Sequence, residues 1–127
     1  MSQPKLISDK QTSVWQLKKR VQKFVDDRDW GKYHKPKNLA MSIAIEASEL
    51  MELFQWVDEK ETDAVIKNHE KLNRLEEELA DIMVYCLSLA NAVNIDISQA
   101  IMRKIDKNER KYPVEEFKGT YKKPRLS

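Results

Sequence analysis

The sequence predicts an all-α fold in which four helices form a bundle and assemble into an oligomer through helix–helix packing. Apolar residues recur at helical spacing along most of the 127-residue chain, and the connections between the periodic segments are short. Only two glycines and four prolines are present, whereas an all-β fold needs a turn about every 8–12 residues. We therefore expect a single domain over residues 1–127, with a core at about 13–113 and a basic, irregular tail at 114–127.

The first helix is expected over about residues 13–28, with Ser13 as its N-cap. Its apolar face is formed by Val14, Leu17, Val21, Phe24 and Val25. Gly31 and Pro36 break the helical pattern, so residues 29–37 form a predicted loop. This loop holds an unusual density of aromatic side chains for a solvated connection, namely Trp30, Tyr33 and His34.

The second helix is expected over about residues 39–57, capped by Asn38. Residues 58–63 are acidic and form either a connection or the first turn of the next helix, where acidic groups suit the helix dipole. The third helical pattern covers about residues 64–93, and a break near residues 68–73 would divide it.

The fourth helix is expected over about residues 97–111, because Asp96 and Gln99 resemble a capping box and Pro113 stops the pattern. The preceding segment, from Leu79 to Val93, has only three polar residues, which are Asp81, Ser88 and Asn91. A helix that is apolar on nearly all sides is central in its bundle or lies in an interface. This surplus of apolar surface favours a homo-oligomer.

Composition narrows the class of protein. Charged residues make up 35 % of the chain but the net charge is only +2, so partners must be read from the distribution of charge. The single cysteine, Cys86, excludes an internal disulfide and suits a reducing compartment. Residues 1–9 lack an apolar signal segment, and no run approaches the roughly 18 apolar residues of a membrane span. We expect a soluble cytoplasmic protein without a membrane partner.

The most informative residues are acids that stand where a helix should be apolar. Glu46 lies within about 60° of the apolar positions of the second helix, and Glu49 lies on the flank of that stripe beside Trp56. The stripe consists of Leu39, Ile43, Leu50, Leu53 and Val57. In the third helix Glu78 takes the equivalent place and Asp81 the flank. Its apolar neighbours are Leu75, Ile82, Tyr85 and Leu89.

An ionised carboxylate on a core-facing stripe is costly, so such groups are either protonated or compensated by cations. Two E-x-x-[ED] pairs on facing helices would form an oxygen-rich cage, and oxygen ligands without His or Cys suit Mg²⁺, with Mn²⁺ as a substitute. A di-iron site would use Glu-x-x-His, but neither His34 nor His69 follows a Glu at that spacing. A single E-x-x-E is common on solvated helices. The apolar surroundings of Glu46 and Glu78 favour a metal site instead.

Four stretches of the chain form a specific set. They are Arg28-Asp29-Trp30 with His34 and Pro36-Lys37-Asn38-Leu39-Ala40; Glu46-Ala47-Ser48-Glu49-Leu50 with Glu52-Leu53-Phe54-Gln55-Trp56; Glu77-Glu78-Leu79-Ala80-Asp81-Ile82; and Lys104-Ile105-Asp106-Lys107-Asn108 with Lys111-Tyr112-Pro113. Over about residues 14–113 the chain thus resembles the MazG-like, all-α nucleotide pyrophosphohydrolases, closest to their dCTP pyrophosphatase branch.

The resemblance implies that Glu46, Glu49, Glu78 and Asp81 bind Mg²⁺, and that the chain hydrolyses nucleoside triphosphates to monophosphate and pyrophosphate. It implies a house-cleaning role in the nucleotide pool and assembly as a dimer, or as a tetramer built from dimers. Among the carboxylates, Glu49 is our candidate to orient or deprotonate the attacking water, with Glu46 beside it in the catalytic group.

The remaining candidates are predicted to bind the substrate. Lys104, Asn108 and Lys111 share one face of the fourth helix, which is either a solvated basic face or, as the resemblance favours, a triphosphate site that includes Tyr112. Trp30 and Trp56 are candidates to stack on the base, although core packing is the ordinary role of a tryptophan.

His34 is expected to donate a hydrogen bond to base or phosphate, and Tyr85 to contact the sugar. A tyrosine packed against the sugar could exclude a 2′-hydroxyl, so deoxynucleotides such as dCTP, or modified forms, are favoured. The sequence departs from the family pattern at one position that bears on base preference: vertebrate-type members have His on the first helix where this chain has Val21.

Two other classes of function compete with this interpretation. A non-catalytic helical interaction protein would use the acids as salt-bridge partners and gain no stability from Mg²⁺. A nucleic-acid binder would use the tail cations Lys118, Lys122, Lys123 and Arg125. The near-neutral net charge and the lack of a longer basic helical stripe argue against nucleic acid as a partner.

Overall fold

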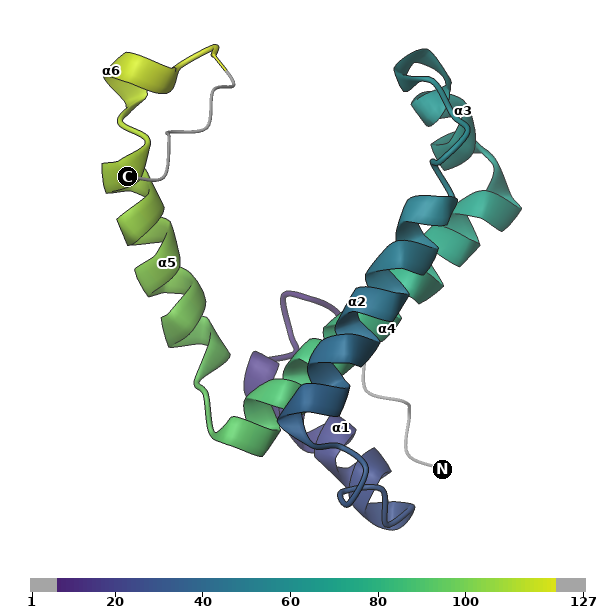
Figure 1. Ribbon diagram of the computed structural model, residues 1–127, viewed down its shortest axis with the longest axis vertical. Helices are drawn as coiled ribbons and strands as arrows, with labels where there is room; N and C mark the ends of the chain where they lie inside the picture. Colours follow the sequence, from purple (N-terminus) through teal and green to yellow (C-terminus); the bar gives the residue numbers. More distant parts are fainter. Residues whose placement is uncertain (1–6, 121–127) are drawn as a thin grey trace. The chain divides into compact units, whose positions relative to one another are not determined.

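A computed structural model describes residues 7–120, which fold into helices and contain no strand (Figure 1). The helices are α1 (Val14–Asp27), α2 (Pro36–Glu52), α3 (Thr62–Lys67), α4 (His69–Val93), α5 (Ile97–Lys111) and α6 (Val114–Phe117), with a 3₁₀ turn, η1, at Glu59–Glu61. The predicted all-α class is confirmed. The predicted number of four helices is wrong for residues 7–120, because the third helix is divided and the tail starts with the short α6.

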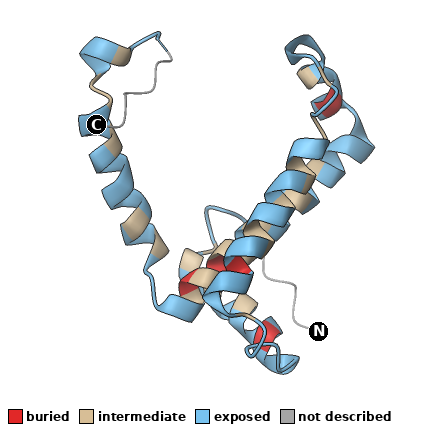
Figure 2. Cartoon of the chain, viewed as in Figure 1, coloured by how far each residue is buried: buried red, intermediate tan, exposed pale blue. Residues whose placement is uncertain are grey.

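The chain separates into two compact units, one ending at Asn94 and the other beginning at Ile95. In the first unit α2 and α4 run side by side in opposite directions and make the most extensive contact, while α1 and α3 each pack on α4 (Figure 1). Figure 2 shows that few of the described residues are buried. They are Val25, Leu39, Val65, Leu87, Ser88 and Ala90, all of the first unit.

Local features mark where α1 begins and where α4 ends. The Ser13 hydroxyl accepts a hydrogen bond from the Gln16 amide at 3.1 Å, and the Gln16 side chain accepts one from the Ser13 amide at 2.8 Å, which completes a capping box. At the other end of the unit Asn94 adopts a left-handed conformation with φ 58° and ends α4. Asparagine tolerates this conformation better than most residues. The predicted cap at Ser13 is confirmed.

Both predicted ends of α2 are wrong. The helix begins at Pro36 with Lys35 as its N-cap, because proline is favoured in the first turn, where its missing N–H is not needed. Asn38 is therefore inside the helix, and its side-chain amide donates to the Tyr33 carbonyl at 3.1 Å. The helix ends at Glu52 rather than near residue 57, since the chain then tightens into turns that begin with the Leu53 amide bonded to the Leu50 carbonyl.

The division of the third helical pattern occurs at Asn68. This residue is extended, with φ −86° and ψ 118°, and its side chain accepts a hydrogen bond from the Lys71 amide at 3.1 Å. An asparagine in this conformation is a favoured N-cap, so it ends α3 and starts α4. Of the two alternatives for residues 58–63, helical structure is the one observed: Asp58 caps η1, which is Glu59–Glu61, and Thr62 and Asp63 begin α3.

The second unit contains α5 and α6. The bounds of α5 agree with the predicted helix, and the Asp96 carboxylate caps it by accepting from the Gln99 amide at 2.9 Å. After Pro113, the ring of Phe117 in α6 packs edge-on against Tyr112 with 5.2 Å between ring centroids. None of the described residues 95–120 is buried. Within residues 7–120, no helix taken singly could cross a membrane, and only α4 and α5 as a bent pair have the required length and composition.

Candidate metal centre and adjoining cavity

Three of the four predicted acidic ligands meet between α2 and α4. Glu46, Glu49 and Glu78 each place one carboxylate oxygen within 4.8 Å of the others, and all three side chains are half-buried. Glu46 and Glu49 are three residues apart on α2, so they project from one face toward Glu78 on α4. This geometry brings oxygen ligands from two helices to one point.

Within residues 7–120, the structure shows no basic side chain paired with this acidic group. One oxygen of Glu46 and one of Glu78 (Oε2 in each) are buried and accept no hydrogen bond in the described structure. The two ion pairs found within residues 7–120, Lys23–Asp27 and Lys32–Asp29, involve none of the three acids. A buried carboxylate oxygen without a donor costs free energy, and a hard divalent cation with oxygen ligands is the partner that fits this set.

The surroundings change how tightly these carboxylates hold a proton. Burial, and then the neighbouring Glu49 and Asp81, raise the pKa of Glu46 to about 7. Burial and the proximity of Glu49 raise the pKa of Glu78 as well. Both shifts arise because burial and adjacent negative charge disfavour the ionised form. A divalent cation would reverse this effect by compensating the charges.

Asp81 is not one of the three acids whose oxygens converge. It follows Glu78 by one turn of α4 and is exposed, yet its charge contributes to the raised pKa values of Glu46 and Glu78. It also lines a neighbouring cavity. Asp81 therefore links the acidic group to the cavity, and its predicted role as a fourth ligand stays a prediction.

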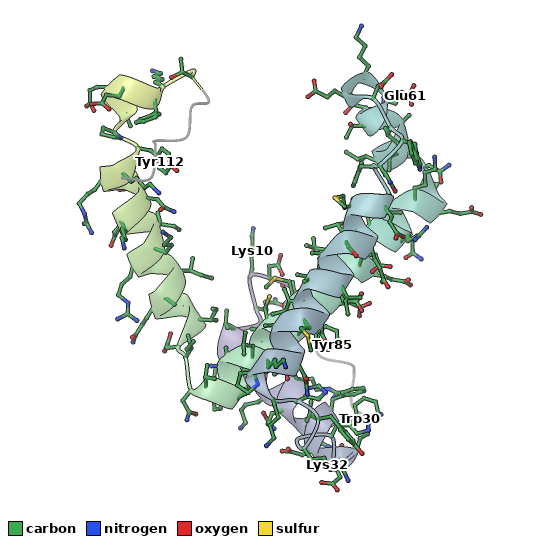
Figure 3. All side chains as sticks on the ribbon, viewed as in Figure 1. Lys10, Trp30, Lys32, Glu61, Tyr85 and Tyr112 are labelled. Carbon is green, nitrogen blue, oxygen red and sulfur yellow. The ribbon has the colours of Figure 1, made fainter. Side chains whose placement is uncertain are left out.

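The cavity has a volume of about 500 Å³, and α1, the loop after it and α4 form its walls. Polar or aromatic groups at its wall include Trp30, His34, Asp81 and Tyr85, while Val21 and Val84 are aliphatic. Figure 3 shows Trp30 in the loop after α1 and Tyr85 on α4. A volume of this size and an apolar lining with a few polar groups are typical of small-molecule sites.

Aromatic contacts order the loop that carries this wall. The ring of His34 stacks on that of Trp30 with 6.4 Å between ring centroids. It also lies next to the Tyr85 ring, again with 6.4 Å between centroids. The Trp30 amide donates to the Val25 carbonyl at 3.0 Å, and the His34 amide donates to the Trp30 carbonyl at 3.1 Å. The predicted site residues Trp30, His34 and Tyr85 thus lie together.

Other predicted site residues lie outside this arrangement. Trp56 follows α2, does not line the cavity and is 87 % exposed. Lys104, Asn108, Lys111 and Tyr112 belong to the second unit, where the Lys111 ammonium lies 5.5 Å from the centroid of the Tyr112 ring. Their predicted contact with a triphosphate stays a prediction.

Ser88 lies at the cavity and is 5 % exposed, and it is absent from the site residues that the sequence predicts. Its hydroxyl oxygen is 3.1 Å from Nδ1 of His34, 54 residues earlier in the chain. The available signal was that Ser88 interrupts an otherwise apolar segment of the third helical pattern.

Known proteins share both the sequence pattern and the fold. The MazG-like family model matches residues 41–124. The dCTP pyrophosphatase 1 of Bos taurus is 38 % identical over 97 residues, which are 76 % of this chain and 57 % of that protein. The human dCTP pyrophosphatase 1 is 37 % identical over 90 residues, or 71 % of this chain and 53 % of that protein. The chain thus matches little more than half the length of these curated relatives.

A solved structure agrees with these matches. A pyrophosphatase from Archaeoglobus fulgidus DSM 4304 superposes with a TM-score of 0.75 and 41 % sequence identity, covering 85 % of this chain and 99 % of that chain. The family match extends over about two-thirds of the sequence and includes Glu46, Glu49, Glu78 and Asp81. On this basis the chain is a member of the MazG-like family.

Proposed function

We propose that this protein is a Mg²⁺-dependent nucleotide pyrophosphohydrolase that converts a (d)NTP and water into a (d)NMP and pyrophosphate. The observation that carries the proposal is the convergence of Glu46, Glu49 and Glu78 within 4.8 Å, beside a cavity of about 500 Å³. Two oxygens of this group are buried and have no donor among residues 7–120. The names of its relatives, which are pyrophosphatases of nucleotides or of unspecified substrate, agree with this chemistry.

The chain's own residues would divide the work of the reaction. Glu46, Glu49 and Glu78, with Asp81 beside them, would hold Mg²⁺, which when bound neutralises phosphate charge and lowers the pKa of a water molecule. Glu49 would orient that water or accept its proton for attack on the α-phosphorus, and Glu46 would support it. Bond cleavage between the α- and β-phosphates then releases pyrophosphate.

Substrate binding would extend from the acidic group into the cavity. Trp30 offers an aromatic face on which the base could stack. His34 offers a ring nitrogen for a hydrogen bond, and Tyr85 would contact the sugar. Lys104, Asn108, Lys111 and Tyr112 would bind the triphosphate. Packing of Tyr85 against the sugar favours deoxynucleotides such as dCTP or modified forms, in line with the names of the mammalian relatives. The cytoplasmic location also remains a prediction.

A direct test is hydrolysis of a panel of natural and modified dNTPs and NTPs with and without Mg²⁺ in water enriched in ¹⁸O. We expect Mg²⁺-dependent formation of monophosphate and pyrophosphate, with dCTP or a modified relative among the best substrates. The heavy oxygen should appear in the monophosphate, because the proposed attack is on the α-phosphorus. Release of orthophosphate, or label in the pyrophosphate, would contradict the proposed reaction.

We also propose that the protein works as a homo-oligomer, a dimer or a tetramer, without a nucleic-acid or membrane partner. Leu72, Leu79 and Met83 recur at i, i+7 and i+11, so they share one face of α4, where they are 39 %, 51 % and 50 % exposed. Trp56 is exposed as well. An exposed apolar stripe on one helix face is what an interaction site would present.

We expect Met83→Glu to shift the protein toward monomer, because it places a charge on this apolar face. Asn73→Glu is the matched control, since it adds the same charge to α4 at an exposed position that is already polar. Sedimentation velocity at equal concentrations would compare the two variants with the parent protein. A parent protein that is monomeric throughout would contradict the proposed assembly.

A further inference from the structure

Ser88 is the one polar residue that is buried among the described residues, and its surroundings leave it a single hydrogen-bond partner. Nδ1 of His34 lies 3.1 Å from its hydroxyl oxygen. Serine within a helix commonly donates its hydroxyl hydrogen to a backbone carbonyl one turn earlier. No such bond is formed by Ser88 here, so the His34 ring is the partner that satisfies it.

This contact fixes where the proton of neutral His34 resides. If Nδ1 carried the proton, it would donate to Ser88, and the buried hydroxyl hydrogen would have no acceptor. If Nδ1 is unprotonated, the hydroxyl donates to it and both groups are satisfied, as buried polar groups generally are. The second arrangement puts the ring proton on Nε2, which forms no hydrogen bond within residues 7–120.

The position of the ring makes this choice matter for the cavity. His34 is in contact with Trp30 on one side and Tyr85 on another, so the aromatic neighbours limit rotation of the ring once Nδ1 is held. His34 and Ser88 both line the cavity together with the charged side chains of Arg20 and Asp81, whereas the aliphatic part of the wall offers no side-chain hydrogen bond.

We propose that Ser88 is a positioning residue that holds His34 as the Nε2-protonated tautomer and thereby gives the cavity a fixed hydrogen-bond donor. The ligand that this donor would recognise is a nucleobase that presents a carbonyl oxygen or an unprotonated ring nitrogen to His34. The identity of the ligand rests on the proposed function, whereas the tautomer of His34 does not depend on it.

The first test measures the tautomer without any nucleotide. The chain has two histidines, so long-range ¹H–¹⁵N spectra of labelled protein contain two imidazole patterns, which the His69→Gln variant assigns. In the spectrum of the neutral rings, recorded in mildly alkaline buffer, we expect the Nε2–H pattern for His34. The exposed His69 should show a tautomer average.

Replacement of Ser88 supplies the contrast. Ser88→Ala should move the His34 signals toward the tautomer average, and Ser88→Thr, which keeps the hydroxyl, should retain the Nε2–H pattern. Circular dichroism would verify that each variant is folded. An Nδ1–H pattern in the parent protein, or an unchanged His34 pattern in folded Ser88→Ala, would overturn the proposal.

The second test uses dCTP as the probe. Without Ser88 the ring can adopt either tautomer and must be selected on binding, so Ser88→Ala should raise KM for dCTP with kcat nearly unchanged. The increase should not exceed the factor of about 2–10 that one neutral hydrogen bond is worth, and Ser88→Thr should restore KM. An unchanged KM in Ser88→Ala would refute the link between the tautomer and binding. Absence of turnover by the parent protein would refute the proposed function, while the spectra would still decide the tautomer.

Discussion

Glu49→Gln is expected to lower kcat for dCTP by about 10²–10⁴-fold, the usual contribution of a general base, and by more if Mg²⁺ is lost. Glutamine has nearly the shape of glutamate but supplies neither the negative charge nor a proton acceptor. Glu49 is half-buried and places its carboxylate within 4.8 Å of Glu46 and Glu78, so few other groups can substitute for it. Initial rates of pyrophosphate release at saturating Mg²⁺ would measure the effect.

The control for this variant is Glu76→Gln, which makes the same chemical change at an exposed position of α4. It should retain the parent rate. Asp81→Asn should lose turnover as Glu49→Gln does, because Asp81 borders both the acidic group and the cavity. Full activity in folded Glu49→Gln would remove Glu49 from the proposed chemistry, and full activity in Asp81→Asn would limit the ligand set to three acids.

The second large effect is the dependence of the free energy of unfolding on pH and on Mg²⁺. The pKa of Glu46 is raised from its ordinary value of 4.5 to about 7 in the folded protein, so the folded state binds this proton more tightly than the unfolded state. The stability that protonation of Glu46 contributes is fully present below about pH 4.5 and is lost as the pH rises through about 7. In the presence of a chelator, the free energy of unfolding should therefore decrease over this interval, and Glu78 should act in the same direction.

Addition of Mg²⁺ at neutral pH should reverse the loss, because only the folded protein brings the three acids together. Ligand at 100 times its dissociation constant stabilises a folded state by about 2.7 kcal/mol. Urea unfolding followed by tryptophan fluorescence, at a series of pH values with chelator or with Mg²⁺, would measure both the loss of stability with pH and the gain from Mg²⁺.

Glu46→Gln separates the proton effect from the metal effect. Without Mg²⁺ this variant should be more stable than the parent protein at neutral pH and should show a flatter pH dependence, because the repulsion among the acids is reduced. It should also gain much less stability from Mg²⁺. A parent protein whose unfolding is insensitive to Mg²⁺ would favour the competing interpretation, in which the acids belong to a non-catalytic interaction protein.

Much of the first unit was predictable because its strongest signals are local. The capping box at Ser13 and the helical spacing of apolar residues lie within a few residues of one another, and both specify α1. The acidic group was also predictable in outline. Glu46 and Glu78 occupy positions where apolar residues were expected, and the structure places both with one buried oxygen.

The errors and omissions have different physical origins. The end of α2 depends on turns after Glu52 that an apolar pattern does not distinguish from another helical turn. The contact of Ser88 with His34 joins residues 54 positions apart, and helical periodicity carries no information about such a pair. The predicted role of Trp56 rested on residue type and spacing, and neither fixes the place of a side chain that is 87 % exposed and lies outside the cavity.

The second unit lacks a core of its own among residues 95–120, and an isolated helix as short as α5, with 15 residues, is only marginally stable in water. If α5 docks on a larger surface, that contact would stabilise the helix that carries Lys104 and Lys111. If that surface belongs to a second copy, dilution of the protein weakens the helix as well as the association. The competence of each catalytic unit would then follow mass action, and the cell's concentration of this chain would itself set how much of it can act.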